Sequence, residues 1–156
     1  MTHWFDARAT RANGLTPEQR RKVGLIKGAL AKSDKELHFL LHQILLAEGS
    51  AIRFGPVPAF AGGPPRLPLD PGLRTRLGAE LLAAAARLAA LHTGLQAERL
   101  LRESLVAAAA GTEAWYRALS TDDGRAIVHA QQTMSKQFAN AEKLHKAGLA
   151  DLEKGR

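Results

Sequence analysis

The chain has 156 residues, no cysteine and a formal net charge of +7. A chain of this length can bury about two-thirds of the surface that it exposes when unfolded, so it can form one core without disulfides or structural metals. The absence of cysteine excludes disulfides, thiolate zinc sites, iron–sulfur clusters and thiol catalysis. The uncharged runs are shorter than the roughly 18 to 20 residues of a membrane span, and the first residues lack the order of a secretory signal. We therefore expect a cytoplasmic protein.

Strong helix formers dominate the sequence, whereas β-branched residues and tyrosine are few. This composition predicts an all-α fold, a helical bundle of about four principal helices. We expect residues 1–15 to form a flexible basic arm and residues 16–156 to form a single helical-bundle domain.

Positive charge is concentrated at the beginning of the chain. Residues 1–35 hold eight lysines and arginines against three acidic residues, so they carry a surplus of five charges. A local surplus indicates an anionic partner, with nucleic acid as the expected one, whereas the alternative is a solvated face that maintains solubility. The candidate residues for this partner are Arg8, Arg11, Arg20, Arg21, Lys27 and Lys35.

The first helix is predicted over residues 16–53. Thr16 suits the N-cap, Pro17 the first helical position, and the acid Glu18 faces the positive end of the helix dipole. An apolar stripe follows with helical spacing at Val23, Ile26, Leu30, Leu37, Leu40, Leu41 and Ile44.

Within this helix, the segment Leu37–Ala47 is apolar on nearly all sides, which indicates a surface covered by the core or by a partner. We expect Phe39, His42 and Leu46 to form a protein interface there. His38 and His42 lie one helical turn apart, so their imidazoles can also converge on one metal ion. The zincin protease pattern needs a glutamate directly after the first histidine, and Phe39 occupies that position.

Residues 55–71 contain six of the seven prolines and predict a long strap that cannot be helical. Its sequence Pro64-Pro65-Arg66-Leu67-Pro68 is similar to a polyproline ligand, although such short patterns recur by chance. We expect instead that Val57, Phe60, Leu67 and Leu69 hold the strap across one end of the bundle.

Asp70 and Pro71 predict the start of a second helix, over residues 70–93. Its leucine and alanine stripe does not continue beyond Leu95, because charged residues occupy the next expected positions. The apolar positions that follow lie about a third of a turn away. A break near Gly94 and a third helix over 95–119 explain this shift more simply than one long helix.

The last helix is predicted over residues 121–154, with caps supplied by the segment 120–123 and a thin stripe of near-heptad spacing. Glu142 and His145 match half of the di-iron signature of ferritin-like bundles, but no second copy occurs. If residues 70–119 formed one helix antiparallel to the last, His92 would lie at the height of His145.

The sequence contains no nucleophile elbow, Walker pattern, dinucleotide loop or recognised nucleic-acid module. The leading hypothesis is a non-enzymatic interaction or assembly protein that self-associates or joins a larger complex and uses its basic face to bind an anionic partner. The alternative is a bundle that binds a divalent metal or haem through His38, His42, His92, Glu142 and His145. A lipid or polymer coat is a third class, but the last helix lacks the bulky apolar face that such coats use.

Overall fold

The computed structural model describes the backbone of residues 14–53 and 71–156, and most side chains of residues 14–37 and 72–156. These described residues form four helices: α1 (Pro17–Arg53), α2 (Pro71–Ala89), α3 (Gln96–Ser120) and α4 (Gly124–Glu153). This confirms the predicted all-α bundle of four helices, with boundaries close to the expected ones. Residues 1–13 of the predicted arm (1–15) lie outside the described residues. The same holds for residues 55–70 of the predicted strap (55–71).

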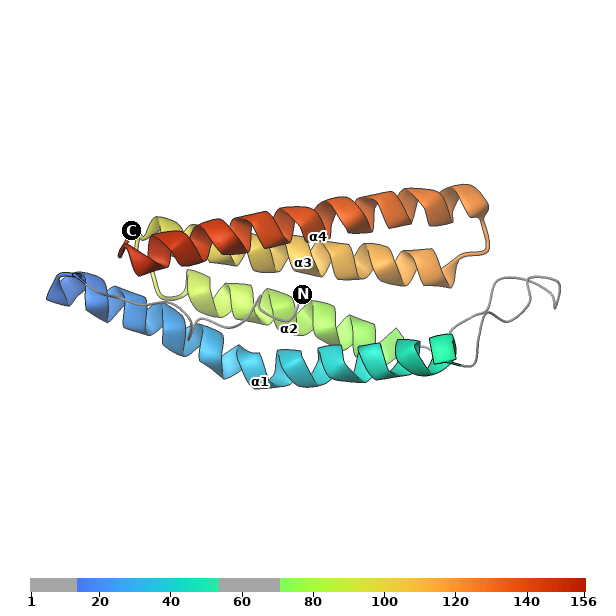
Figure 1. The fold of residues 1–156 in the computed structure, drawn as a ribbon, viewed down its shortest axis with the longest axis horizontal. Coiled ribbons are helices and arrows are strands. Elements are labelled where there is room, and N and C mark those ends of the chain that lie inside the picture. Colours follow the sequence, from blue (N-terminus) through green and yellow to red (C-terminus); the bar gives the residue numbers. More distant parts are fainter. Residues whose placement is uncertain (1–13, 54–70) are drawn as a thin grey trace.

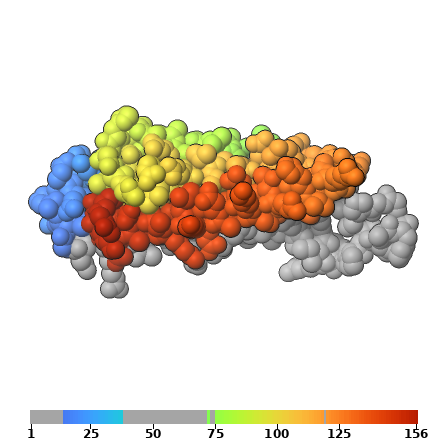
Figure 2. Space-filling view, turned by 90° about the horizontal axis from the view of Figure 1, so that it is seen from above, coloured from blue at the N-terminus to red at the C-terminus, as the bar shows by residue number. Residues whose placement is uncertain are grey.

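The helices pack mainly in chain order, α1 on α2, α2 on α3 and α3 on α4. Figure 1 shows an elongated molecule in which α1 and α4 lie on opposite sides, with α2 and α3 between them. Figure 2 shows α3 and α4 side by side along the length of the molecule. Since α2 has a neighbour on each flank, the face of α2 opposite the core is turned outward.

The start of α1 is the one that the sequence predicts. The Thr16 backbone N–H donates to Gln19 Oε1 at 2.9 Å, and the Gln19 backbone N–H donates to Thr16 Oγ1 at 3.1 Å. This reciprocal pair is a capping box, which satisfies backbone donors that the helix leaves unpaired. Gln19 Nε2 also donates to the Gly155 carbonyl at 3.4 Å, so the beginning of α1 contacts the end of the chain.

The other helix starts are set by similar local contacts. Asp123 is the N-cap of α4, where its carboxylate accepts the Arg125 backbone N–H at 3.1 Å, as the segment 120–123 predicts. Pro71 is the first residue of α2, whereas the predicted cap Asp70 lies outside the described residues.

A turn separates α2 from α3, so the prediction of a third helix is correct and the single long helix over 70–119 does not form. His92 and Gly94 both have positive φ in this turn, at 48° and 72°. Glu98 is buried, and its carboxylate accepts the Thr93 backbone N–H at 3.3 Å. Glu98, one of the charged residues that interrupt the predicted apolar stripe, therefore stabilises the turn between α2 and α3.

The core runs the length of the described bundle. On α1 it contains four residues of the predicted stripe together with the buried hydroxyl of Ser33. Its large side chains are Leu15, Val23, Ile26, Leu30, Leu37, Leu77, Leu81, Leu88, Leu101, Leu105 and Leu152. In α4 most of the buried residues are small, such as Ala130, Ala141 and Gly148, so this helix lies close against α3. None of the helices in the described residues is long and apolar enough to cross a membrane.

Candidate functional site

Four of the six residues predicted to bind an anionic partner lie in the described part of α1. Arg20, Arg21 and Lys35 are exposed and Lys27 is half-buried, whereas Arg8 and Arg11 lie outside the described residues. Arg20 Nε donates to the Leu15 carbonyl at 3.3 Å, which folds this side chain back toward the start of the helix.

Arg21 is paired with an acid on the same helix. Its Nη2 lies 2.7 Å from Glu18 Oε1, and Lys22 Nζ lies 3.9 Å from the same oxygen. The hydrogen bond from Arg21, and then the positive charges of Arg21 and Lys22, lower the pKa of the Glu18 carboxyl. The same hydrogen bond and charge raise the pKa of Arg21. Glu18 therefore neutralises part of the predicted basic face.

The predicted protein interface of Phe39, His42 and Leu46 belongs to the second half of α1. The backbone there is helical, but these side chains lie outside the described ones. The interface therefore stays a prediction.

The predicted metal ligands that the structure describes do not come together. His92 is exposed in the α2–α3 turn, His145 is buried in α4, and the exposed Glu142 pairs with Lys146 at 3.3 Å. Among the described residues, no group of three or more histidines and carboxylates could hold a metal ion. The side chains of His38 and His42 lie outside this part, so the two-histidine site stays a prediction that elemental analysis and an absorbance spectrum of the purified protein would test.

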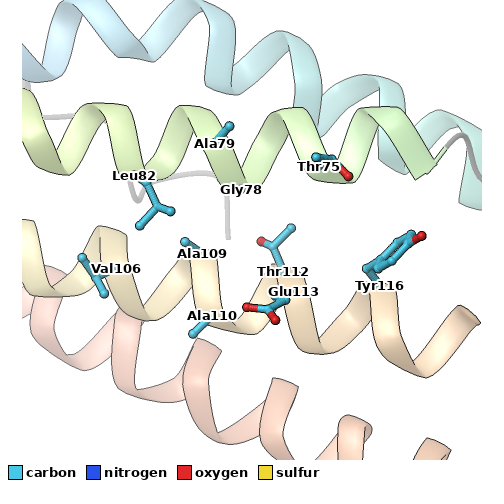
Figure 3. A pocket seen from close by; sticks show the side chains of 10 residues that line it. All are labelled: Thr75, Gly78, Ala79, Leu82, Val106, Ala109, Ala110, Thr112, Glu113 and Tyr116. Carbon is cyan, nitrogen blue, oxygen red and sulfur yellow. The ribbon is translucent and has the colours of Figure 1, made fainter.

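An apolar groove lies between α2 and α3, and sequence reasoning missed it. Its volume is about 460 Å³. Figure 3 shows Leu82 reaching from α2 toward α3, with Val106 and Tyr116 on the α3 side. These three side chains are 51%, 47% and 37% exposed. The groove is lined by Thr75, Gly78, Ala79, Leu82, Val106, Ala109, Ala110, Thr112, Glu113 and Tyr116.

A second groove, of about 350 Å³, follows the other flank of α2, where it packs on α1. Leu25 is 40% exposed there, and Lys32 and Arg87 carry positive charge. Arg87 Nη1 donates a hydrogen bond to the hydroxyl of Ser33, which is buried. The groove is lined by Gly24, Leu25, Gly28, Ala29, Lys32, Arg87, Ala90 and Leu91.

One exposed stripe of α2 carries no charge, while the exposed Arg76 and Arg87 lie beside it on the side of α1. The stripe consists of Thr75, Ala79, Leu82 and Ala86, followed by Ala90 just beyond the helix. By contrast, the exposed residues of α4 include many charged ones, among them Lys136, Glu142, Lys143 and Lys146. An exposed helix in water usually has the composition of α4, so this stripe of α2 is unusual.

Large exposed apolar side chains gather around this stripe. In the described part of the chain there are five of them, and four line the two grooves: Leu25, Leu82, Val106 and Tyr116. We call this surface, made of the uncharged stripe of α2 and the two grooves beside it, the α2 surface. The alanine run of residues 81–90 was the signal in the sequence, because it is longer than one buried stripe requires.

Comparison of the chain with protein-family models, with curated proteins and with solved structures finds no match. Function must therefore be inferred from the geometry and chemistry of the surface itself.

Proposed function

We propose that this chain is a non-enzymatic interaction protein that binds an α-helix of a partner protein along the α2 surface. The observation that carries the proposal is the uncharged exposed stripe of α2, which Arg76 and Arg87 border on the side of α1. The two grooves beside it hold four of the five large exposed apolar side chains of the described residues. Apolar patches of this kind on soluble proteins mark interaction sites.

The shape of the surface supports a helical occupant. The lining residues on α3 extend from Val106 to Tyr116, which is about 15 Å along a helix at 1.5 Å per residue. Both grooves lie between packed helices, so a row of side chains on a third helix can enter either one. Alanines let its backbone approach closely, and Leu82 is the large side chain that it would cover.

The charge of the molecule supports a different protein as the occupant rather than a second copy. Every copy has a net charge of +7, and Lys32 and Arg87 line one groove of the α2 surface. The repulsion between two chains of the same net charge disfavours a second copy on this surface. Self-association through Phe39 and Leu46 is a separate proposal, supported by the apolar character of the segment 37–47.

The basic face of α1 adds an anionic partner to the proposal, with nucleic acid as the partner class and the cytoplasm as the location. Its support is the charge surplus of residues 1–35 and the exposure of Arg20 and Lys35.

The test uses a designed helical peptide with a leucine stripe and no net charge, whose binding is followed by fluorescence anisotropy. The wild-type protein should bind it, and Leu82→Glu and Val106→Glu should each weaken binding strongly. Val128→Glu is the matched control, because Val128 is 52% exposed on α4 and lines neither groove. Equal losses in all three variants would refute the α2 surface as the binding site.

Light scattering tests whether a second copy of the chain, rather than a different protein, occupies the α2 surface. A wild-type dimer that Leu82→Glu converts to a monomer would show that a second copy covers the α2 surface, and it would overturn the proposal of a different partner.

A further inference from the structure

We infer that the helix bound by the α2 surface carries carboxylates along the edge that meets α1, so that the partner is an acidic amphipathic helix. The inference rests on the proposed function and adds the chemistry of the partner and its orientation.

The groove between α1 and α2 holds two cations without acids. Lys32 and Arg87 both line it, and none of its described lining residues is acidic. Within the part of the chain that the structure describes, neither cation forms an ion pair with a carboxylate. Elsewhere along the same contact, Arg76 of α2 pairs with Glu36 of α1 at 2.7 Å. Glu36 therefore neutralises Arg76, whereas Lys32 and Arg87 leave the groove positively charged.

Arg87 is held in place for an incoming carboxylate. Its Nη1 donates to the hydroxyl of Ser33, which is 2% exposed, so one end of the guanidinium is fixed to α1. A guanidinium has five N–H donors in a planar fork, and one bond to a hydroxyl leaves the others available. Such donors match the two oxygens of a carboxylate.

The floor of this groove allows close approach of a helix. A Cβ atom placed on Gly24 or Gly28 would meet no atom within 4 Å, so both positions open to free space. Leu25 and Leu91 provide the apolar walls. An occupant therefore needs an apolar stripe for the floor and negative charge for the rim.

The groove on the other flank of α2 has the opposite polarity. Its one charged lining residue among those described is Glu113, and the hydroxyl-bearing residues Thr75, Thr112 and Tyr116 also line it. Carboxylates on a partner helix are attracted by the α1 flank and repelled by the α3 flank. A partner helix with carboxylates along only one edge therefore binds with that edge facing α1.

The test compares three designed peptides that share one leucine stripe and carry glutamate, glutamine or lysine along one edge. In low salt, the glutamate peptide should bind most tightly and the lysine peptide most weakly. Lys32→Gln together with Arg87→Gln should cost about tenfold in affinity for the glutamate peptide and leave the glutamine peptide nearly unaffected.

Matched controls separate the groove from the charge of the whole molecule. Lys136→Gln with Lys143→Gln removes the same number of charges from the exposed face of α4. An equal loss in this control would overturn the inference. Arg87→Gln also changes the contact with Ser33, so circular dichroism checks the fold of this variant. Lys32→Gln is therefore also measured alone. It should reduce the preference for the glutamate peptide over the glutamine peptide severalfold.

The outcomes distinguish this inference from the proposed function. Equal affinity for the three peptides would refute the acidic partner while leaving helix binding intact. Binding of no peptide would refute both. Duplex DNA that competes with the glutamate peptide, in a manner that depends on Lys32 and Arg87, would assign the groove to phosphate instead and overturn the acidic helix.

Discussion

Gly148 of α4 lies directly against Leu101 of α3. A Cβ atom at position 148 would be 2.8 Å from Leu101 Cγ and 3.2 Å from the Leu101 backbone nitrogen. These distances are too short for ordinary van der Waals contact, and the backbone nitrogen cannot rotate away. The close packing of α3 on α4 therefore depends on glycine at this position.

Gly148→Ala should destabilise the protein by about 1–3 kcal/mol, because overpacking outweighs the better helix propensity of alanine. Urea unfolding followed by circular dichroism measures the difference. Gly24→Ala is the control, since its Cβ would meet nothing within 4 Å, and it should stabilise α1 by about 0.5–1 kcal/mol. A Gly148→Ala protein as stable as the wild type would contradict the contact.

Loss of the capping box should weaken α1 at its start. Thr16→Ala removes the acceptor for the Gln19 backbone N–H and should cost about 1 kcal/mol in the free energy of unfolding. Gln19→Ala should cost a similar amount, and the double variant less than the sum, because the two residues form one motif. Thr133→Ala serves as a control in an exposed helix interior, where its hydroxyl donates to the His129 carbonyl. Strict additivity of the two cap variants would argue against the reciprocal bonds.

The Glu18–Arg21 pair should make stability depend on pH. The pKa of Glu18 is lowered in the folded protein, so its contribution is present above the unfolded pKa of about 4.3 and is lost as pH falls through the folded value. Glu18→Gln should therefore lower the melting temperature at neutral pH and low salt, and this difference should disappear in acid. Glu113→Gln, which removes an exposed carboxylate without an ion pair among the described residues, should show no such pattern. A difference that persists at low pH or high salt would rule out the ion pair as its cause.

The basic face of α1 should bind duplex DNA or RNA in a salt-dependent manner. Replacing Arg20, Lys27 and Lys35 by glutamine should weaken binding and reduce the slope of log K against log salt by about 0.7–0.9 for each phosphate that the protein no longer neutralises. Glu18→Gln should strengthen binding, because it releases Arg21. Titrations by fluorescence anisotropy at several salt concentrations measure both effects.

The control for this prediction replaces Lys136, Lys143 and Lys154 by glutamine, which removes the same charge from exposed positions in and just after α4. If this control weakens binding as much as the α1 variant does, the effect is caused by the net charge of the protein rather than by the basic face of α1. An affinity that does not change with salt would exclude nucleic acid as the partner of this face.

Local signals in the sequence were sufficient to locate the helices. Thr16 with Pro17 and the caps before Gly124 predicted the starts of α1 and α4, because N-caps act through contacts within a few residues. Apolar periodicity also predicted the core stripe of α1 and the break near Gly94, since a helix exposes or buries whole faces. For the same reason the sequence determined the class of fold.

The candidate site depended on which helices become neighbours, and periodicity contains no such information. In the sequence, nothing distinguishes Leu25, Leu82 and Tyr116 from the apolar residues of the core. Only the tertiary packing places them at the rims of grooves. Glu98 illustrates the reverse, since a charged residue is buried there and its carboxylate accepts the Thr93 backbone N–H of the turn before α3. The sequence by itself determined where helices form and which face each one buries. The tertiary structure decided what the remaining faces meet, because that depends on contacts between residues far apart in the chain.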